Sequence, residues 1–423
     1  MNGWIDKFAE KMMPLAAKLG QNRYLTVLRD AFMLAFPLTM FGSLVVVLNN
    51  LPFWPENVSL QLNTLLGNGQ NATMSIMTVF VAFGIGYYLT KSYGEDGVFG
   101  GVVALASFLI LTPFFFETAE GAAVTGALSL DRLGAKGMFI GMIAAFIAAE
   151  IYVRITKKGI TIKMPNGVPE AVSRSFAALI PAITTLTVFL LLNAAVNGFF
   201  NTNLHDVVYT IMQKPLVGLG SGLPATLVAL LFAQLLWFFG LHGQVIVNSV
   251  MDPIWQTLSL ENLAAYKLGD ELPHIISKSF METYTVGLGG SGMTLAVVLM
   301  MAFFFKNKQM KEIGRLALAP GVFNVNEPVI FGLPIVLNAT IMIPWVITPL
   351  IVTSFNYAVM ALGIFPIPTG VTVPWTVPIF LSGMMATNSV MGGILQLLDL
   401  VIVVLCWFPF LKIFEKVNAS TKL

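Results

Sequence analysis

The sequence predicts an all-α polytopic membrane protein with about ten transmembrane helices, two re-entrant hairpins and an N-terminal amphipathic helix. Charged residues account for only 10% of its 423 residues, against about 25% in a soluble domain, and 57% are hydrophobic. The mean hydropathy is +0.82. A soluble chain of this size would need more charged groups to cover its surface. Apolar runs near the length that crosses a bilayer also recur along the chain.

The same composition excludes several classes of protein. High hydrophobicity excludes intrinsic disorder, and a net charge of +2 provides no basic footprint for nucleic acid. The single cysteine, Cys406, lies in the apolar run VIVVLCWF, so it cannot form an intramolecular disulfide or a cysteine metal site. The glycine-rich run at 287–292 lacks the Lys and Ser or Thr of a Walker loop. We expect no cofactor, no metal site and no nucleic-acid partner.

Residues 1–22 predict an amphipathic helix that lies on the membrane surface. Apolar side chains recur there at helical spacing among lysines: Trp4, Phe8, Met12, Leu15 and Leu19. A short cytoplasmic helix packed on the protein itself is an equally good interpretation of this pattern.

The first half of the chain predicts five regular spans. They cover residues 24–48, 73–89, 98–116, 137–153 and 176–199. A basic loop at 154–174 follows the fourth span and marks a boundary. We therefore predict an N-terminal half at 23–175 and a C-terminal half at 176–423.

The second half alternates apolar runs with broken stretches. Spans are predicted at 223–239, 286–305, 338–362 and 390–410, and Pro and Gly interrupt the apolar stretches at 240–258, 314–338 and 364–388. Non-helical backbone at membrane depth survives only where protein or a water-filled cavity satisfies it. We therefore expect a lined cavity here, with the first broken stretch crossing as a short span and the other two forming re-entrant hairpins.

Basic residues set the orientation. With both termini in the cytoplasm, most of the 23 Lys and Arg residues fall on the inner side, as the positive-inside rule requires.

Two ionisable residues within the broken stretches are candidates for function, because such groups are costly in a membrane. Glu327 lies in Asn324-Val325-Asn326-Glu327-Pro328, and the proline favours a helix break at Glu327. A carboxylate beside two amides suits a ligand with many hydroxyls. His242 lies among glycines in GLHGQ, and a histidine can relay a proton near neutral pH. Purely structural hydrogen bonds to backbone are the alternative for both residues.

Two tryptophans near the broken stretches, Trp237 and Trp375, are candidates for stacking on a sugar ring, with interfacial anchoring as the alternative. Anchoring is the interpretation for Trp54, Trp255 and Trp407. Thr387 and Asn388 could add hydrogen bonds from the end of the last hairpin. Asp399 and Glu150 are interpreted as structural.

With these residues in view, the sequence resembles the enzyme IIC membrane component of the phosphoenolpyruvate-dependent sugar phosphotransferase system, in its lactose, cellobiose and diacetylchitobiose family. The resemblance covers nearly the whole chain. It is carried by GLHGQ at 240–244, by the signature GVFNVNEPVIFGLPIVLN at 321–338, and by the VPW and ATNS segments around Trp375 and Asn388. The NEPVIFG string is its specific part.

The resemblance implies a homodimer whose first half makes the dimer contact, and a second half that holds the sugar. It assigns Glu327 and His242 to the sugar hydroxyl that becomes phosphorylated. The predicted sugar contacts are Trp237, Gln244, Asn324, Asn326, Trp375, Thr387 and Asn388. It also implies a bacterial cytoplasmic membrane protein in contact with lipid.

The implied function is transport of a disaccharide of the cellobiose, diacetylchitobiose or lactose type, with its 6-hydroxyl presented to a phosphorylated IIB protein at the cytoplasmic face. The donor would be a phosphocysteine of that partner, since Cys406 lies in an apolar run. A proton-coupled sugar symporter with Glu327 as its proton site is the alternative. A membrane receptor without transport explains the polar groups on broken helices less well.

Overall fold

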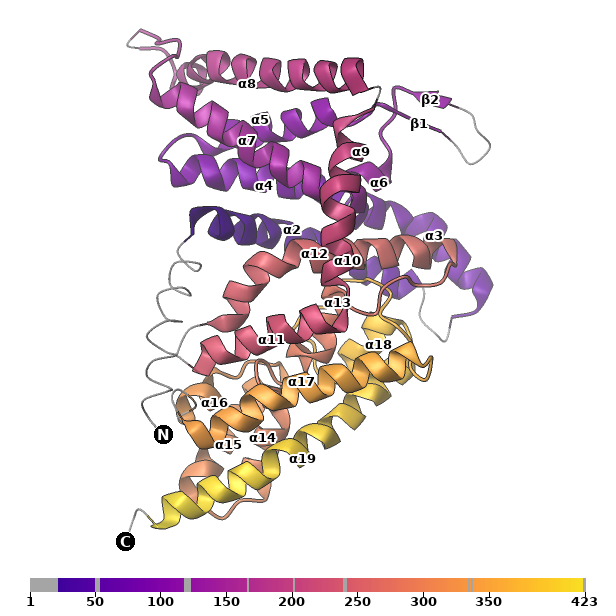
Figure 1. Ribbon diagram of the computed structural model, residues 1–423, viewed down its shortest axis with the longest axis vertical. Coiled ribbons are helices and arrows are strands. Elements are labelled where there is room, and N and C mark those ends of the chain that lie inside the picture. Colours follow the sequence, from indigo (N-terminus) through magenta and orange to yellow (C-terminus); the bar gives the residue numbers. More distant parts are fainter. Residues whose placement is uncertain are drawn as a thin grey trace. The chain divides into compact units, whose positions relative to one another are not determined.

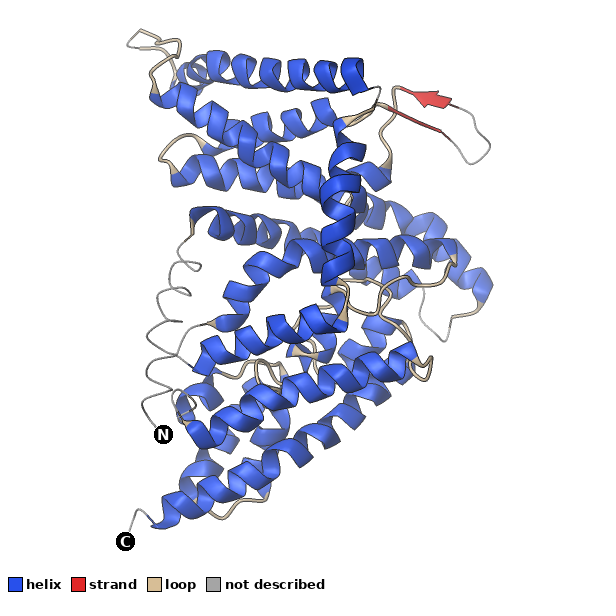
Figure 2. Cartoon of the chain, in the orientation of Figure 1, coloured by secondary structure: helices blue, strands red, loops and turns tan. Residues whose placement is uncertain are grey.

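The chain, seen in a computed structural model, forms two compact units. The structure describes residues 22–49, 54–117, 123–165, 167–200, 202–238, 242–333, 335 and 338–420. Residues 21–42 and 67–218 form the N-terminal unit, and residues 43–66 and 219–423 belong to the C-terminal unit. Helices dominate both, and Figure 2 shows a two-stranded ribbon beside them. The predicted helical class is therefore confirmed, while the predicted helix at 1–22 lies outside the described residues.

Long helices build the N-terminal unit. They are the first part of α2 (Arg23–Asn49), the end of α3 (Glu56–Asn71), α4 (Met77–Ser92), α5 (Gly97–Leu111), α7 (Met138–Lys157) and α8 (Glu170–Phe200). In Figure 1, α8 covers α5 and α7, which in turn pack on α4. Shorter elements connect them: η1 (Met74–Ile76), β1 (Phe115–Glu117), β2 (Ala123–Thr125), α6 (Leu130–Leu133), η2 (Ala135–Gly137), α9 (Leu204–Val208), η3 (Tyr209–Gln213) and most of α10 (Lys214–Gly220).

Polar contacts at helix ends hold this unit together. Asp96 caps α5, because its carboxylate accepts from the backbone N–H of Val98 at 3.0 Å, and Arg174 of α8 pairs with the same carboxylate. Tyr24 and Tyr93 both donate to Glu150 of α7, at 2.9 and 2.6 Å. Glu150 therefore has the structural role that the sequence predicts.

Long helices alternate with short ones in the C-terminal unit. After the end of α2 and the start of α3 come α11 (Leu223–Phe238), α12 (Gly243–Leu268), α13 (Lys278–Tyr284), η4 (Val286–Leu288), α14 (Leu295–Phe303), α15 (Lys308–Val322), α16 (Glu327–Gly332), α17 (Ala339–Ala361), α18 (Leu381–Thr387) and α19 (Val390–Ser420). Residues 364–380, between α17 and α18, form no helix or strand, and we call them the arm.

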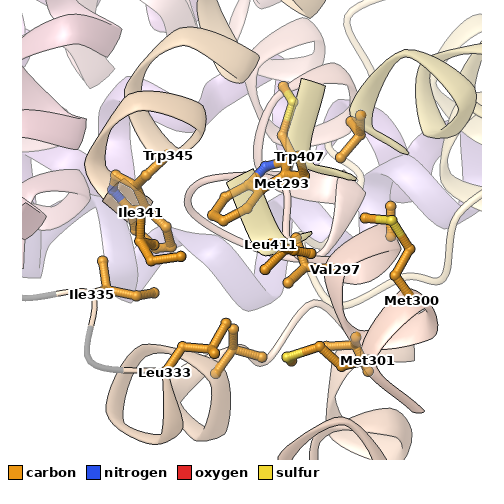
Figure 3. Packing of buried hydrophobic residues seen from close by; sticks show 14 of the residues in the cluster. Met293, Val297, Met300, Met301, Leu333, Ile335, Ile341, Trp345, Trp407 and Leu411 are labelled. Atoms are coloured by element: carbon orange, nitrogen blue, oxygen red, sulfur yellow. The ribbon is translucent and has the colours of Figure 1, made fainter. Parts of the chain in front are cut away.

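A buried apolar cluster underlies this unit, drawn mainly from α14, α15, α16, α17 and α19, with Met293 before α14 and Trp237 of α11. Figure 3 shows Trp407 and Leu411 of α19 beside Met293 and Val297. Trp345 and Trp407 are fully buried, and Trp255 is 1% exposed. The predicted interfacial position of Trp255 and Trp407 is therefore wrong, because both indoles pack inside the protein.

The described residues include six helices long and apolar enough to span a membrane. They are Arg23–Val46, Asn57–Ser92, Ala135–Lys157, Glu170–Phe200, Thr340–Ala361 and Val390–Lys416, and the interrupted pair Leu204–Gly220 and Leu223–Trp237 could supply a seventh. The total of ten crossings and the re-entrant character of the two hairpins stay predictions.

Two predicted segments differ from the structure. The stretch at 240–258 was expected to be broken, but α12 runs without interruption from Gly243 and keeps Pro253 inside it. The span at 286–305 was expected to be continuous, but η4 and a left-handed loop precede α14, which is only nine residues long. The predicted boundary at residue 175 lies within α8, inside the N-terminal unit, which extends to Gly218.

Candidate functional site

The turn between α15 and α16 carries the predicted asparagines. The backbone N–H of Val325 donates to the carbonyl of Pro320 and that of Asn324 to the carbonyl of Gly321, both at 3.0 Å. This pairing is a Schellman cap, and Asn324 occupies its left-handed position with φ 62°. The sequence N-V-N therefore ends α15 sharply and places both asparagines at the start of α16.

The Asn324 side chain joins three segments. Its Oδ1 accepts from the backbone N–H of Gly289 at 2.7 Å, and its Nδ2 donates to the carbonyls of Trp375 (2.5 Å) and Val377 (3.1 Å). Asn324 is 2% exposed, and both amide hydrogens are used. In this arrangement its amide fixes the arm to the loop before α14.

That loop, residues 287–293, is held in left-handed geometry. Gly289, Gly290, Gly292 and Met293 all have positive φ, between 58° and 101°. A Cβ on Gly290 would lie 2.7 Å from the Asn324 carbonyl oxygen, and one on Gly292 would lie 2.4 Å from the Trp345 ring. Asn326 Nδ2 donates to the carbonyl of Ser291 at 2.7 Å. We call residues 287–293 the glycine loop, and these contacts show that it is tightly packed.

A row of aromatic rings leads from the glycine loop to His242. Trp407 Nε1 donates to the carbonyl of Gly292 at 3.2 Å, and the Trp407 ring meets Trp345 edge to face at 6.4 Å between centroids. Trp345 meets Trp237 at 6.5 Å, and Trp237 lies 4.3 Å from the His242 ring. His242 is exposed and immediately precedes α12. The structure thus brings two of the predicted site residues, Trp237 and His242, into contact.

The other predicted contacts lie on neighbouring elements. Thr387 is buried at the end of α18, where its hydroxyl donates to the Gly383 carbonyl at 2.9 Å. Asn388 is left-handed and donates to the Tyr266 hydroxyl at 2.8 Å. Gln244 donates to Asn248, one turn along α12, at 3.1 Å.

Trp375 and Glu327 complete the set. The Trp375 side chain is 39% exposed, on the arm that Asn324 holds through its carbonyl. Glu327 is the first residue of α16, and its side chain lies outside the described residues.

Comparison with known proteins decides the family. The model of the family described as phosphotransferase system, EIIC, matches residues 29–349. The chain is 61% identical to the oligo-beta-mannoside-specific EIIC component of Bacillus subtilis, over 98% of this chain and 95% of that protein. It is 39% identical to the cellobiose-specific EIIC component of Geobacillus stearothermophilus, over 99% and 96%. The crystal structure of ChbC, the IIC component of an N,N'-diacetylchitobiose-specific phosphotransferase system, matches with a TM-score of 0.92 and 36% identity, over 98% of this chain and 99% of that one.

The chain belongs to the phosphotransferase EIIC family. It is a multi-pass membrane protein that transports sugar within the cellobiose and lactose group of this family, as the resemblance implies. EIIC components act with a IIB partner, so membership implies that partner and a sugar substrate.

In this EIIC chain, sequence reasoning missed one residue that organises the site. Gln396 of α19 is fully buried and accepts from the backbone N–H groups of Phe380 (2.9 Å) and Gly383 (2.7 Å). Its Nε2 donates to the Thr283 carbonyl at 2.9 Å. Gln396 thereby anchors the end of the arm and the start of α18. An amide inside a mostly apolar span was the available signal.

Proposed function

We propose that this EIIC component binds a β-linked oligosaccharide of mannose units, carries it across the cytoplasmic membrane and presents its 6-hydroxyl for phosphorylation by phosphorylated IIB. The main support is the identity of 61% along nearly the whole chain with a component named oligo-beta-mannoside-specific, against 39% with the cellobiose-specific one. The proposal narrows the predicted substrates, which were disaccharides of the cellobiose, diacetylchitobiose or lactose type.

Phosphorylation explains how transport becomes irreversible. The sugar is neutral when it enters, and a phosphate adds roughly 1.5 to 2 negative charges at pH 7. The product cannot return through an apolar path at that charge. Binding, translocation and trapping then share one site, which must expose the hydroxyl to the cytoplasm.

We assign the acid–base work to Glu327 and His242. A general base must come within hydrogen-bond reach of the hydroxyl from which it takes a proton, and a carboxylate or a neutral imidazole can do this at neutral pH. Supporting this role, His242 is exposed, and its ring lies against Trp237. Glu327 follows directly on Asn326, which is tied to the glycine loop. Trp237 and Trp375 would hold the apolar faces of the sugar rings.

The experiment uses inside-out membrane vesicles that contain the full chain. Phosphorylated IIB and labelled β-mannobiose are supplied, with cellobiose and lactose as competing sugars. We expect mannobiose phosphate to form, and cellobiose to compete more weakly than unlabelled mannobiose. Sugar uptake that needs a proton gradient and produces no sugar phosphate would establish the symporter alternative instead.

The basic residues of two separate segments are proposed to bind the IIB partner. Lys306, Lys308 and Arg315, before and within α15, are exposed. In the segment 154–174, Arg174 is paired with Asp96 at 2.5 Å, so its charge is partly neutralised. Reversing the three charges near α15 should raise the KM for phosphorylated IIB at low salt. An unchanged KM after reversal of both segments would remove this surface from the proposal.

A homodimer formed by the N-terminal unit also stays a proposal. Supporting it, α8 exposes several large apolar side chains, including Ile183, Leu190 and Leu191. Membrane lipid covers the same kind of surface, so the test is cross-linking between cysteines placed singly along α8 in native membranes. Cross-links that recur every three to four residues would identify the dimer face, and their absence along all of α8 would exclude it.

A further inference from the structure

A carboxylate that forms no ion pair with any of the described residues lies inside the C-terminal unit. Asp399 of α19 is 0% exposed, and its Oδ2 accepts from Nδ2 of Asn356 on α17 at 2.9 Å. Figure 1 shows α17 and α19 side by side, and they pack along their length. An ionised carboxylate buried this way is costly, and such groups are normally paired with a cation or neutralised.

The elements around Asp399 supply no cation. Neither α14, α17, α18 nor η4 contains Lys, Arg or His. On α13, Lys278 is bound to Asp252 and Glu282, each at 2.7 Å. Lys412 of α19 pairs with Glu415 at 3.1 Å, more than three turns away. Lys416 lies farther along α19, more than four turns from Asp399. The other titratable side chains on the packed helices are Tyr284, Tyr357 and Cys406, all neutral in their ordinary states at pH 7.

One oxygen of Asp399 and one of Asn356 lack a hydrogen-bond donor among the described residues. Oδ1 of Asp399 and Oδ1 of Asn356 are both buried, and neither receives a hydrogen bond. Asn356 is also 0% exposed, so solvent does not reach its oxygen. Each oxygen can only accept while Asp399 is ionised, and an unsatisfied buried acceptor costs about 1–3 kcal/mol.

One proton would satisfy both oxygens. If Oδ1 of Asp399 carries a hydrogen, it can donate to Oδ1 of Asn356 while Oδ2 continues to accept from Nδ2. The carboxylic acid and the amide then form a closed, reciprocal pair with no net charge. We propose that Asp399 and Asn356 form a proton-binding site between α17 and α19, in which Asp399 is a neutral acid.

The position of this site suggests what the proton controls. Gln396, which anchors the end of the arm and α18, lies three residues before Asp399 and therefore on the same face of α19. Loss of the proton would place a charge one turn from that anchor. The proposal uses no assumption about the sugar, so it can fail or succeed independently of the proposed function.

Infrared spectroscopy of the full chain in lipid nanodiscs tests the proposal. At about pH 7, we expect a carboxylic-acid C=O stretch that shifts after exchange into heavy water. The band should disappear in Asp399→Asn and remain in Glu312→Gln, which removes an exposed carboxylate from α15. No band, or a band that survives in Asp399→Asn, would overturn the proposal.

Thermal unfolding provides the second measurement. Asp399→Asn allows a reciprocal amide pair, so its unfolding midpoint should stay within a few degrees of the wild type, whereas Asn356→Leu should lower it by several degrees. If both variants lowered the unfolding midpoint equally, the proposal that Asp399 is a neutral acid would be contradicted. The proposal would also fail if the wild type showed no acid band and its unfolding midpoint rose with NaCl but not with choline chloride. That result would identify a sodium site in place of a proton site.

Discussion

The N-terminal unit consists mainly of long continuous helices, whereas the C-terminal unit repeatedly interrupts its chain. Among the described residues, all four non-glycine residues with positive φ belong to the C-terminal unit: Met293, Asn324, Phe380 and Asn388. None of the seven tryptophans falls at 21–42 or 67–218. Left-handed turns expose backbone donors and acceptors, and indoles provide flat apolar surfaces. The difference supports the proposal that the C-terminal unit holds the sugar, with the N-terminal unit as scaffold.

The largest expected effect tests this division directly. Glu327→Gln should lower the rate of sugar phosphorylation by about 100-fold or more, because it removes the proposed base, while the unfolding temperature stays the same. Glu150→Gln is the matched change in the N-terminal unit, where the carboxylate accepts from Tyr24 and Tyr93 and pairs with Arg154 at 3.4 Å. Vesicle phosphorylation assays measure both. Equal losses would contradict the division.

Glycine substitutions compare the two units at one backbone geometry. Gly292 and Gly159 have φ of 77° and 71°, but a Cβ on Gly292 would meet the Trp345 ring, whereas no atom lies within 4 Å of one on Gly159. Gly292→Ala should cost about 3 kcal/mol of unfolding free energy and Gly159→Ala about 1 kcal/mol. Denaturation of the purified protein in detergent measures the pair. Similar costs would show that the glycine loop repacks freely.

The Asn324 tie should affect stability and sugar binding together. Asn324→Asp removes both donors to the arm, which should cost about 2 kcal/mol and weaken sugar binding by several-fold through displacement of Trp375. Asn193→Asp removes a comparable donor, to the Ile110 carbonyl, in the N-terminal unit. Isothermal titration of sugar should show a weaker Kd for the first variant alone. If the sugar Kd of Asn324→Asp were unchanged or lower, Asn324 would contribute to folding only.

Trp375→Ala should have the smallest effect, confined to binding. Its side chain is 39% exposed, so we expect the unfolding temperature to hold and the sugar Kd to rise about tenfold, or about 1.4 kcal/mol. Trp54 is 40% exposed and provides the matched control, with no expected change in Kd. Intrinsic fluorescence titration measures both variants. A loss of stability in Trp375→Ala would show that the ring supports the arm.

The sequence predicted the N-terminal unit more fully than the C-terminal one, for a physical reason. In α7 and α8, hydrophobic length alone determines a span, and length can be counted. The interruption at 286–305 depends on tertiary contacts, since the left-handed glycine loop packs against Asn326 and Trp345. Conversely, Pro253 does not end α12, although proline density predicted a break there.

The site was predicted as a set of residues but not as an arrangement. Ionisable and amide side chains are rare in apolar sequence, and this rarity identified the segments around His242 and Asn324. It could not show that both amide hydrogens of Asn324 are used by the arm. Nor could it place Trp407 inside the protein, because α19 is apolar on nearly every face and gives no periodicity to separate lipid from core.

The Schellman turn at Asn324 also limits how this position can change over evolutionary time. Glycine would adopt the left-handed backbone but has no side chain to join the glycine loop to the arm. Aspartate could accept from Gly289 but could not donate to the Trp375 and Val377 carbonyls. Glutamine carries the same amide on a longer stem, and its backbone enters the left-handed region less readily. Asparagine alone meets both demands, so a lineage that loses it must rebuild the turn and the arm together.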